Sequence, residues 1–182
     1  MKRLSIIILS LLASSAIMTY AQEVTDAEIL AIRTAYRDAK QLVELNSHAQ
    51  EQSVPRNDME VVSHYVIPGC GPTEEVIHYY FTLEENSETD YYVNRPYLIT
   101  RSYNVAARKF YEEFLFDKDE TLLFFFQTND ALDGGTDETR YYYGKNGIHQ
   151  SIKGHAEIDE TFAARLADDL KTAFNHLINR NW

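Results

Sequence analysis

The stretch FYEEFLFDKDETLLFFFQ, residues Phe110 to Gln127, decides the fold. Two apolar runs flank the polar turn DKDE, and this pattern is typical of a β-hairpin. Side chains alternate across a strand, so a hairpin centred on Lys118 and Asp119 carries apolar residues on both faces. A strand with one solvated face would alternate apolar and polar residues instead. We therefore predict that protein covers both faces of this hairpin.

The same centre assigns each side chain to a face. On one face we expect Phe110, Glu112, Phe114 and Phe116 opposite Thr121, Leu123, Phe125 and Gln127. On the other face we expect Tyr111, Glu113 and Leu115 opposite Leu122, Phe124 and Phe126.

Further strands are predicted on both sides of this hairpin. Asn146-Gly147 favours a tight hairpin turn near the end of the chain, and that hairpin should place Tyr142 with Arg140 on a solvated face. Short consecutive strands joined by turns indicate an antiparallel meander of about six to seven strands. The strands flanking the central hairpin are predicted at 60–67, 75–83, 95–106, 139–143 and 148–152.

One amphipathic helix is predicted to begin near Thr25, and another is predicted at the C-terminal end of the chain. Thr25 and Glu28 form a T-x-x-E capping box, and apolar residues follow at helical spacing from Ile29. Asp159 is the expected N-cap of the second helix. Each helix has one apolar side, so each should lie on a protein surface. The fold class is therefore α+β, with both terminal helices packed against the meander.

Three arrangements of these layers stay open. A helix lies on each face, the sheet curls into a partial barrel around one helix, or one face is an apolar surface for a partner. We favour a curled sheet that packs against both helices.

The first residues indicate export. Met1-Lys2-Arg3 is positively charged, Leu4 to Met18 is apolar or small, and Thr19-Tyr20-Ala21 suits cleavage before Gln22. We expect a signal peptide at 1–21, a single domain at 22–182, and a periplasmic or secreted location. The apolar run is shorter than the roughly 20 residues of a membrane span, which favours a cleaved signal over the alternative of an uncleaved anchor. No later stretch is apolar enough to cross a bilayer, so no span is expected after cleavage.

Charge and motifs exclude several function classes. The chain has 17 Lys and Arg against 28 Asp and Glu, a formal net charge of −11, which disfavours nucleic-acid binding. No G-x-S-x-G, P-loop, G-x-G-x-x-G or H-E-x-x-H motif occurs, and we expect no cofactor and no metal. The lone Cys70 lies in the turn IPGCGPTE. We take it as a turn residue, with a nucleophile or an intermolecular disulfide as the alternatives.

His64 and His78 are one candidate site. If the first hairpin turns about Gly71, the two histidines face each other with Cβ atoms about 5 Å apart. Such a pair could share a metal or act on a substrate. The alternative is a pair of partly exposed strand histidines.

Glu112, Glu113 and Tyr142 complete the candidate binding residues. A carboxylate in the most apolar hairpin must be paired or lie at a rim, and the strands nearby offer Arg101, Arg108 and Arg140. The structural interpretation is a Glu–Arg ion pair, whereas the catalytic one is a general acid in a cavity.

The runs YNVAARKFYEEFLFD, LLFFF and RYYYGKNGI, within residues 96–153, give one resemblance. They look like small exported bacterial proteins of uncharacterised function that pair a helix with an antiparallel meander. The resemblance implies a bacterial, exported protein, but it implies no activity and no catalytic residues.

Together these features predict an exported binding or accessory protein rather than an enzyme. Its partner is a protein, a peptide or a small ligand, and the sequence does not specify the oligomeric state. The alternatives are a small hydrolase or lyase with a site in the sheet's concavity, and an enzyme-inhibitor module that uses a loop such as 84–96.

Overall fold

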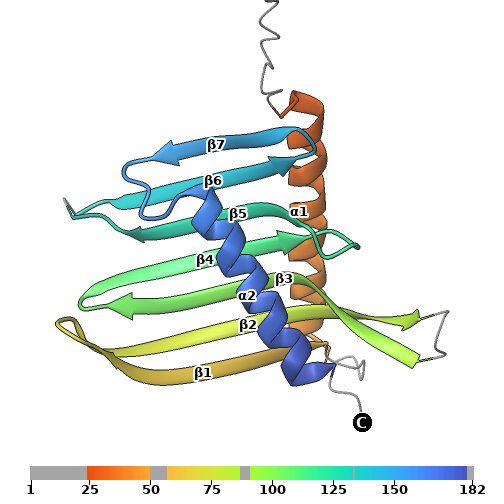
Figure 1. The fold of residues 1–182 in the computed structure, drawn as a ribbon, viewed down its shortest axis with the longest axis horizontal. Helices are drawn as coiled ribbons and strands as arrows, with labels where there is room; N and C mark the ends of the chain where they lie inside the picture. The colour runs from red at the N-terminus through yellow and green to blue at the C-terminus, as the bar shows by residue number, and fades with distance from the viewer. Residues whose placement is uncertain (1–23, 50–56, 87–90, 133, 180–182) are drawn as a thin grey trace, which may run out of the picture.

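The structure, a computed structural model, describes residues 24–49, 57–86, 91–132 and 134–179 (Figure 1). The predicted signal peptide lies outside these residues. The elements in chain order are α1 (Asp26–Ser47), β1 (Asp58–Ile67), β2 (Gly71–Asn86), β3 (Tyr91–Val105), β4 (Arg108–Phe116), β5 (Leu122–Asp130), β6 (Thr136–Gly144), β7 (Gly147–Lys153) and α2 (Glu160–Ile178).

The seven strands form one antiparallel sheet in chain order, from β1 to β7. Each predicted strand is confirmed, and most are longer than predicted. The sheet does not close, because β1 and β7 are not paired with each other and remain its two edges. The α+β meander with two terminal helices is therefore the fold of this chain.

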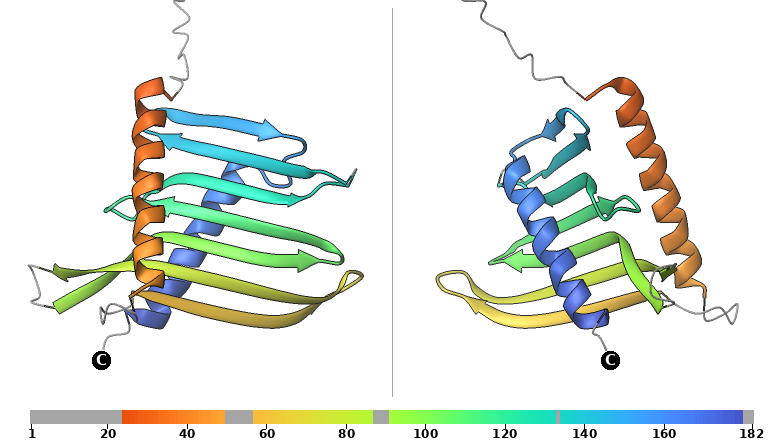
Figure 2. Two further views of the ribbon diagram at one scale, coloured as in Figure 1. Left: turned by 180° about the vertical axis from the view of Figure 1, so that it is seen from behind. Right: turned by 45° about the vertical axis from the view of Figure 1, so that its right-hand side comes forward.

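The two helices cover opposite faces of the sheet, which is the first of the three arrangements (Figures 1 and 2). Under α2, Phe114 and Phe125 are fully buried, and under α1 Leu115 and Phe124 are buried. The prediction that both faces of the central hairpin are covered is confirmed. Burying each of these side chains contributes roughly 1.5–3 kcal/mol.

The helix starts also follow the sequence. The Thr25 hydroxyl accepts from the backbone N–H of Glu28, and the Glu28 carboxylate accepts from the backbone N–H of Thr25. This is the predicted capping box. At the start of α2, the Asp159 carboxylate accepts from the backbone N–H of Phe162 at 2.7 Å.

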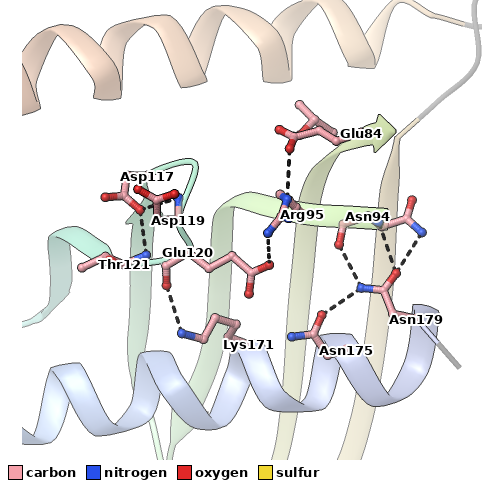
Figure 3. Close-up of polar contacts among 11 residues, drawn as sticks. Glu84, Asn94, Arg95, Asp117, Asp119, Glu120, Thr121, Lys171, Asn175 and Asn179 are labelled. Atoms are coloured by element: carbon pink, nitrogen blue, oxygen red, sulfur yellow. Dashed lines mark hydrogen bonds and ion pairs between the residues drawn. The ribbon is translucent and has the colours of Figure 1, made fainter. Parts of the chain in front are cut away.

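Polar contacts attach the C-terminal half of α2 to the sheet (Figure 3). The Asn179 amide accepts from the backbone N–H of Asn94 at 3.2 Å and donates to its carbonyl at 2.9 Å. Lys171 donates to the carbonyl of Glu120, in the turn between β4 and β5. Because Asn94 lies in β3, these contacts tie α2 to two separate parts of the meander.

The face assignments in the central hairpin are correct except near its turn. Phe114 pairs with Phe125, and a bulge follows, so that Phe116 pairs with Leu122. The extra residue exchanges the two leucines: Leu122 packs on the α2 side and Leu123 on the α1 side, the reverse of the prediction. A bulge places two residues opposite one and reverses the alternation beyond it.

The last hairpin is confirmed, but its loop residues and the solvent exposure of one of its faces differ from the prediction. Gly144 pairs with Gly147, so the loop residues are Lys145 and Asn146. The shift leaves each side chain on its predicted face. However, Tyr142 is only 4% exposed, because α1 covers the end of the sheet that was expected to be solvated.

The α1 side of the sheet is only partly covered. Figure 2 shows α1 crossing the strands near one end of the sheet. On this side Val62 and Val66 of the edge strand β1 are 47% and 71% exposed.

None of the helices in the described part of the chain has both the length and the apolar character needed to cross a membrane.

Candidate functional site

A cavity of about 210 Å³ lies between α1 and the strands β5 and β6. Three of its lining side chains are buried, and they form an apolar floor. The others stand at the rim. The lining residues are Ile32, Arg33, Tyr36, Phe124, Arg140 and Tyr142.

Simple periodicity brings these residues together. Ile32 and Tyr36 are one helical turn apart and therefore share the face of α1 that points at the sheet. Arg140 and Tyr142 are two residues apart in β6 and share one face of the strand. The pairing of Phe124 with Tyr142 then places the β5 ring beside them.

The floor is largely aromatic. The rings of Phe124 and Tyr142 lie 4.9 Å apart, and the Tyr36 ring meets Phe124 edge-on at 5.2 Å. Ile32 is 6% exposed, Phe124 5% and Tyr142 4%. The packing of α1 on the sheet therefore holds these three side chains in place. Flat rings with an aliphatic neighbour suit a ligand with an apolar body.

Two guanidinium groups lie at the rim. Arg33 lies over the ring of Tyr142, with Cζ 5.5 Å from the ring centroid. Arg140 lies over the ring of Phe126 at 5.0 Å and forms an ion pair with Glu138 at 2.7 Å. As far as the described residues define the lining, it contains no carboxylate.

Glu113 lies beside this cavity rather than in it. Its buried carboxylate accepts hydrogen bonds from the hydroxyls of Tyr36 at 2.5 Å and Tyr111 at 2.6 Å, and Lys40 donates to it at 2.8 Å. Burial, then the bond to Glu113, raises the pKa of Tyr36 and also that of Tyr111. Both phenols therefore stay protonated donors, and Tyr36 is positioned to shape the cavity wall.

Glu112 points to the other face, into a separate polar cluster. It forms an ion pair with Arg101 at 3.0 Å and accepts from the Tyr103 hydroxyl and from the Gln127 amide. Arg101 is shared with Glu75 at 2.5 Å. The buried Oε1 of Gln127 has no partner among the described residues. The predicted Glu–Arg ion pair is thus present at Glu112, whereas Glu113 uses Lys40 of α1.

The predicted pairing of His64 with His78 is wrong. His64 pairs with Glu74 and His78 with Glu60, and each histidine lies beside the carboxylate of its strand partner. The turn lies two residues earlier than predicted. Pro68 and Gly69 occupy its centre, Gly69 has φ of +83°, and the Cys70 N–H donates to the Ile67 carbonyl at 3.0 Å.

That geometry is a type II turn, which favours proline followed by glycine at its two central positions. The Pro68-Gly69 dipeptide was therefore the signal that fixes the register of β1 and β2. It was missed because the sequence around Cys70 offers glycine at 69 and again at 71.

The surface also has shallower hollows. One of them, of about 430 Å³, lies at the β1–β2 turn and includes His64 and Glu74. The side chains of His64 and Glu74 are 71% and 63% exposed, so this hollow lacks the buried floor of the cavity under α1. Within the described part of the chain, no three His, Cys, Asp or Glu side chains are grouped as metal ligands.

The hairpin of β2 and β3 extends beyond the core of the sheet (Figure 1). Leu83 and Tyr92 on this arm are 52% and 64% exposed. At its base, Arg95 contacts Glu84 at 3.0 Å and Glu120 at 3.1 Å, as Figure 3 shows. The inhibitor role of loop 84–96 stays a prediction, and residues 87–90 lie outside the described part.

Of the sequence-predicted site residues, only Tyr142 lines the cavity under α1. Sequence reasoning placed Arg140 and Tyr142 on one face but missed Arg33, Tyr36 and Phe124, because nothing local indicates where α1 crosses the sheet. Comparison of the chain with protein-family models, with curated proteins and with solved structures gives no match.

Proposed function

We propose that this chain is an exported, non-catalytic binding protein and that its ligand occupies the cavity between α1, β5 and β6. The observation that carries the proposal is the buried apolar floor of Ile32, Phe124 and Tyr142 below a polar rim. A concave apolar surface with a few polar groups is the usual form of a small-molecule site.

The lining also favours binding over catalysis. The six lining side chains include no carboxylate, histidine or thiol, so the cavity has no evident nucleophile or general base. Glu112 and Glu113, the candidates for acid–base work, are both occupied in ion pairs. A ligand in this cavity would therefore be held rather than transformed.

Filling the cavity tests the proposal. Ile32→Phe adds volume to the floor, and Leu30→Phe adds the same ring on α1 at a position that is 66% exposed. Ligand-observed NMR with a library of small anionic, neutral and cationic aromatic compounds should give hits with the wild type and with Leu30→Phe. The hits should be lost with Ile32→Phe, once circular dichroism has confirmed its fold.

If Ile32→Phe does not fold, Phe124→Trp, which adds volume to the floor from β5, serves the same purpose. A library without any hit would contradict the proposal. Hits that bind equally to the wild type and to a folded, cavity-filled variant would place the ligand elsewhere and contradict it as well.

Export has its own test. The basic start, the apolar run and the small residues before Gln22 support cleavage by signal peptidase. When the full chain is produced in a bacterium, N-terminal sequencing of the periplasmic or secreted product should begin at Gln22. A cytoplasmic product that retains Met1 and the apolar run would contradict export.

A further inference from the structure

We infer that the ligand of the cavity is a small monoanion, a carboxylate on a compact apolar body such as one aromatic ring. This inference rests on the proposed function, because it specifies the ligand class of the same cavity. It follows from the positive charge at the rim of the cavity, from the Tyr142 hydroxyl as a donor, and from the volume of the cavity.

The charge of the site is positive in a strongly acidic chain. Arg33 is solvent-exposed, lies over the Tyr142 ring and has no carboxylate partner within the described residues. Among the residues that the structure describes, Arg140 pairs with one carboxylate, that of Glu138. The two guanidinium groups have one neighbouring carboxylate, that of Glu138, which Lys153 also approaches at 3.9 Å. The rim therefore carries an excess of positive charge, although the whole chain has a formal net charge of −11. This excess matches a monoanion and repels a cation.

The donors of the site suit a carboxylate. Arginine presents a planar fork of N–H groups that matches the two oxygens of a carboxylate. Tyr142 lines the same cavity, and its hydroxyl makes no hydrogen bond within the described part of the chain. By contrast, the Tyr36 hydroxyl is already donated to Glu113, so Tyr142 is the phenol available to a ligand.

The size and floor of the site define the rest of the ligand. At about 210 Å³, the cavity is smaller than the roughly 300–1,000 Å³ that holds a drug-sized ligand. One ring or a short branched chain fits this space and packs on Phe124 and Ile32. The carboxylate then faces the rim, where Arg33 and Arg140 lie.

Three probes of similar size test the inference by isothermal titration calorimetry: benzoate, neutral benzamide and cationic benzylamine. Benzoate should bind the wild type about tenfold or more tightly than benzamide, and benzylamine should bind most weakly. Arg33→Gln and Arg140→Gln should each weaken benzoate about fivefold, the upper range for a partly exposed charge pair, and leave benzamide unchanged.

Arg37→Gln is the matched control. Arg37 lies one turn after Arg33 on α1, is exposed, and pairs with Asp38, so its loss should not change benzoate affinity. Added salt should weaken benzoate and leave benzamide unaffected, because salt screens exposed charges.

The outcomes separate the two proposals. Two results would overturn the inference that the ligand is a monoanion while leaving the cavity as a ligand site. One is equal affinity for benzoate and benzamide. The other is an equal loss of affinity for both probes in Arg33→Gln and Arg140→Gln. Failure of all three probes would overturn the monoanion, since benzoate is the simplest member of its class. The library and the cavity-filling variants then decide separately whether the cavity is a ligand site.

Discussion

Glu112 and Glu113 are consecutive residues of β4, and their buried carboxylates lie on opposite faces of the sheet. Glu113 binds Tyr36 and Lys40 of α1, so its contacts join a helix to the sheet. Glu112 binds Arg101, Tyr103 and Gln127, which all belong to strands. The pair of adjacent acids thus has two different structural roles.

Removing the charge of Glu112 should destabilise the sheet. In Glu112→Gln an amide N–H₂ replaces one of the two carboxylate oxygens, both of which accept hydrogen bonds from neighbouring strands. We expect a loss of about 3 kcal/mol in the free energy of unfolding, the lower end for breaking a buried ion pair, because Glu75 still pairs with Arg101. Urea denaturation measures the loss, and Glu85→Gln, at an exposed position, should be near neutral. A near-neutral Glu112→Gln would contradict this role.

Removing the Tyr36 hydroxyl that donates to Glu113 should weaken the attachment of α1 to the sheet. Tyr36→Phe keeps the ring in the cavity wall and deletes the donor to Glu113, which should cost about 1 kcal/mol. Hydrogen exchange should become faster in α1 while α2 is unchanged. Tyr65→Phe is the control, because the Tyr65 ring is 39% exposed. Equal acceleration in both helices would show that Glu113 does not attach α1 specifically.

The fully buried Phe174 should dominate the packing of α2. It lies 5.4 Å from the rings of both Tyr79 and Phe81, and Phe174→Ala should cost about 3–5 kcal/mol through the cavity that it leaves. Phe162 belongs to the same helix but is 42% exposed, so Phe162→Ala should cost much less. Thermal or urea unfolding of the two variants compares them directly. Similar losses would mean that α2 does not pack as described.

Stability should fall in alkaline solution. Burial raises the pKa of Tyr97 to about 12, whereas tyrosine in an unfolded chain has a pKa of about 10. The folded state therefore keeps a proton that the unfolded state loses, and the stabilisation present below about pH 10 is lost as the pH rises towards about 12. Urea midpoints across this range should fall more gently for Tyr97→Phe than for Tyr92→Phe, an exposed control. Identical slopes would contradict the prediction.

The sequence was most informative where local pattern and burial agree. Apolar residues on both faces of Phe110–Phe116 predicted that protein covers both sides of this strand pair, and the capping box at Thr25 and Glu28 predicted the start of α1. Register was harder, because it depends on which of several turn residues forms the turn. The choice of Gly71 over Gly69 moved the predicted partner of His64 by four positions and created a histidine pair that does not exist.

The site was harder still, because it depends on where α1 crosses the sheet. Arg33 and Phe124 are 91 positions apart in the numbering and meet only through that packing. No local periodicity encodes such a contact. Lys40, the partner of Glu113, was missed for the same reason, although the need for some cationic partner was predicted from the cost of an unpaired buried charge.

The most direct test of the ligand site is to map where benzoate binds. In ¹³C methyl and aromatic NMR spectra of the chain from Gln22 to Trp182, benzoate should shift the signals of Ile32, Phe124 and Tyr142 in a saturable manner. The signals of Ala167 and Phe174, on the opposite face under α2, should stay unchanged. Saturable shifts confined to the α2 face, or no saturable shift at Ile32, Phe124 and Tyr142, would contradict a benzoate-binding site between α1, β5 and β6.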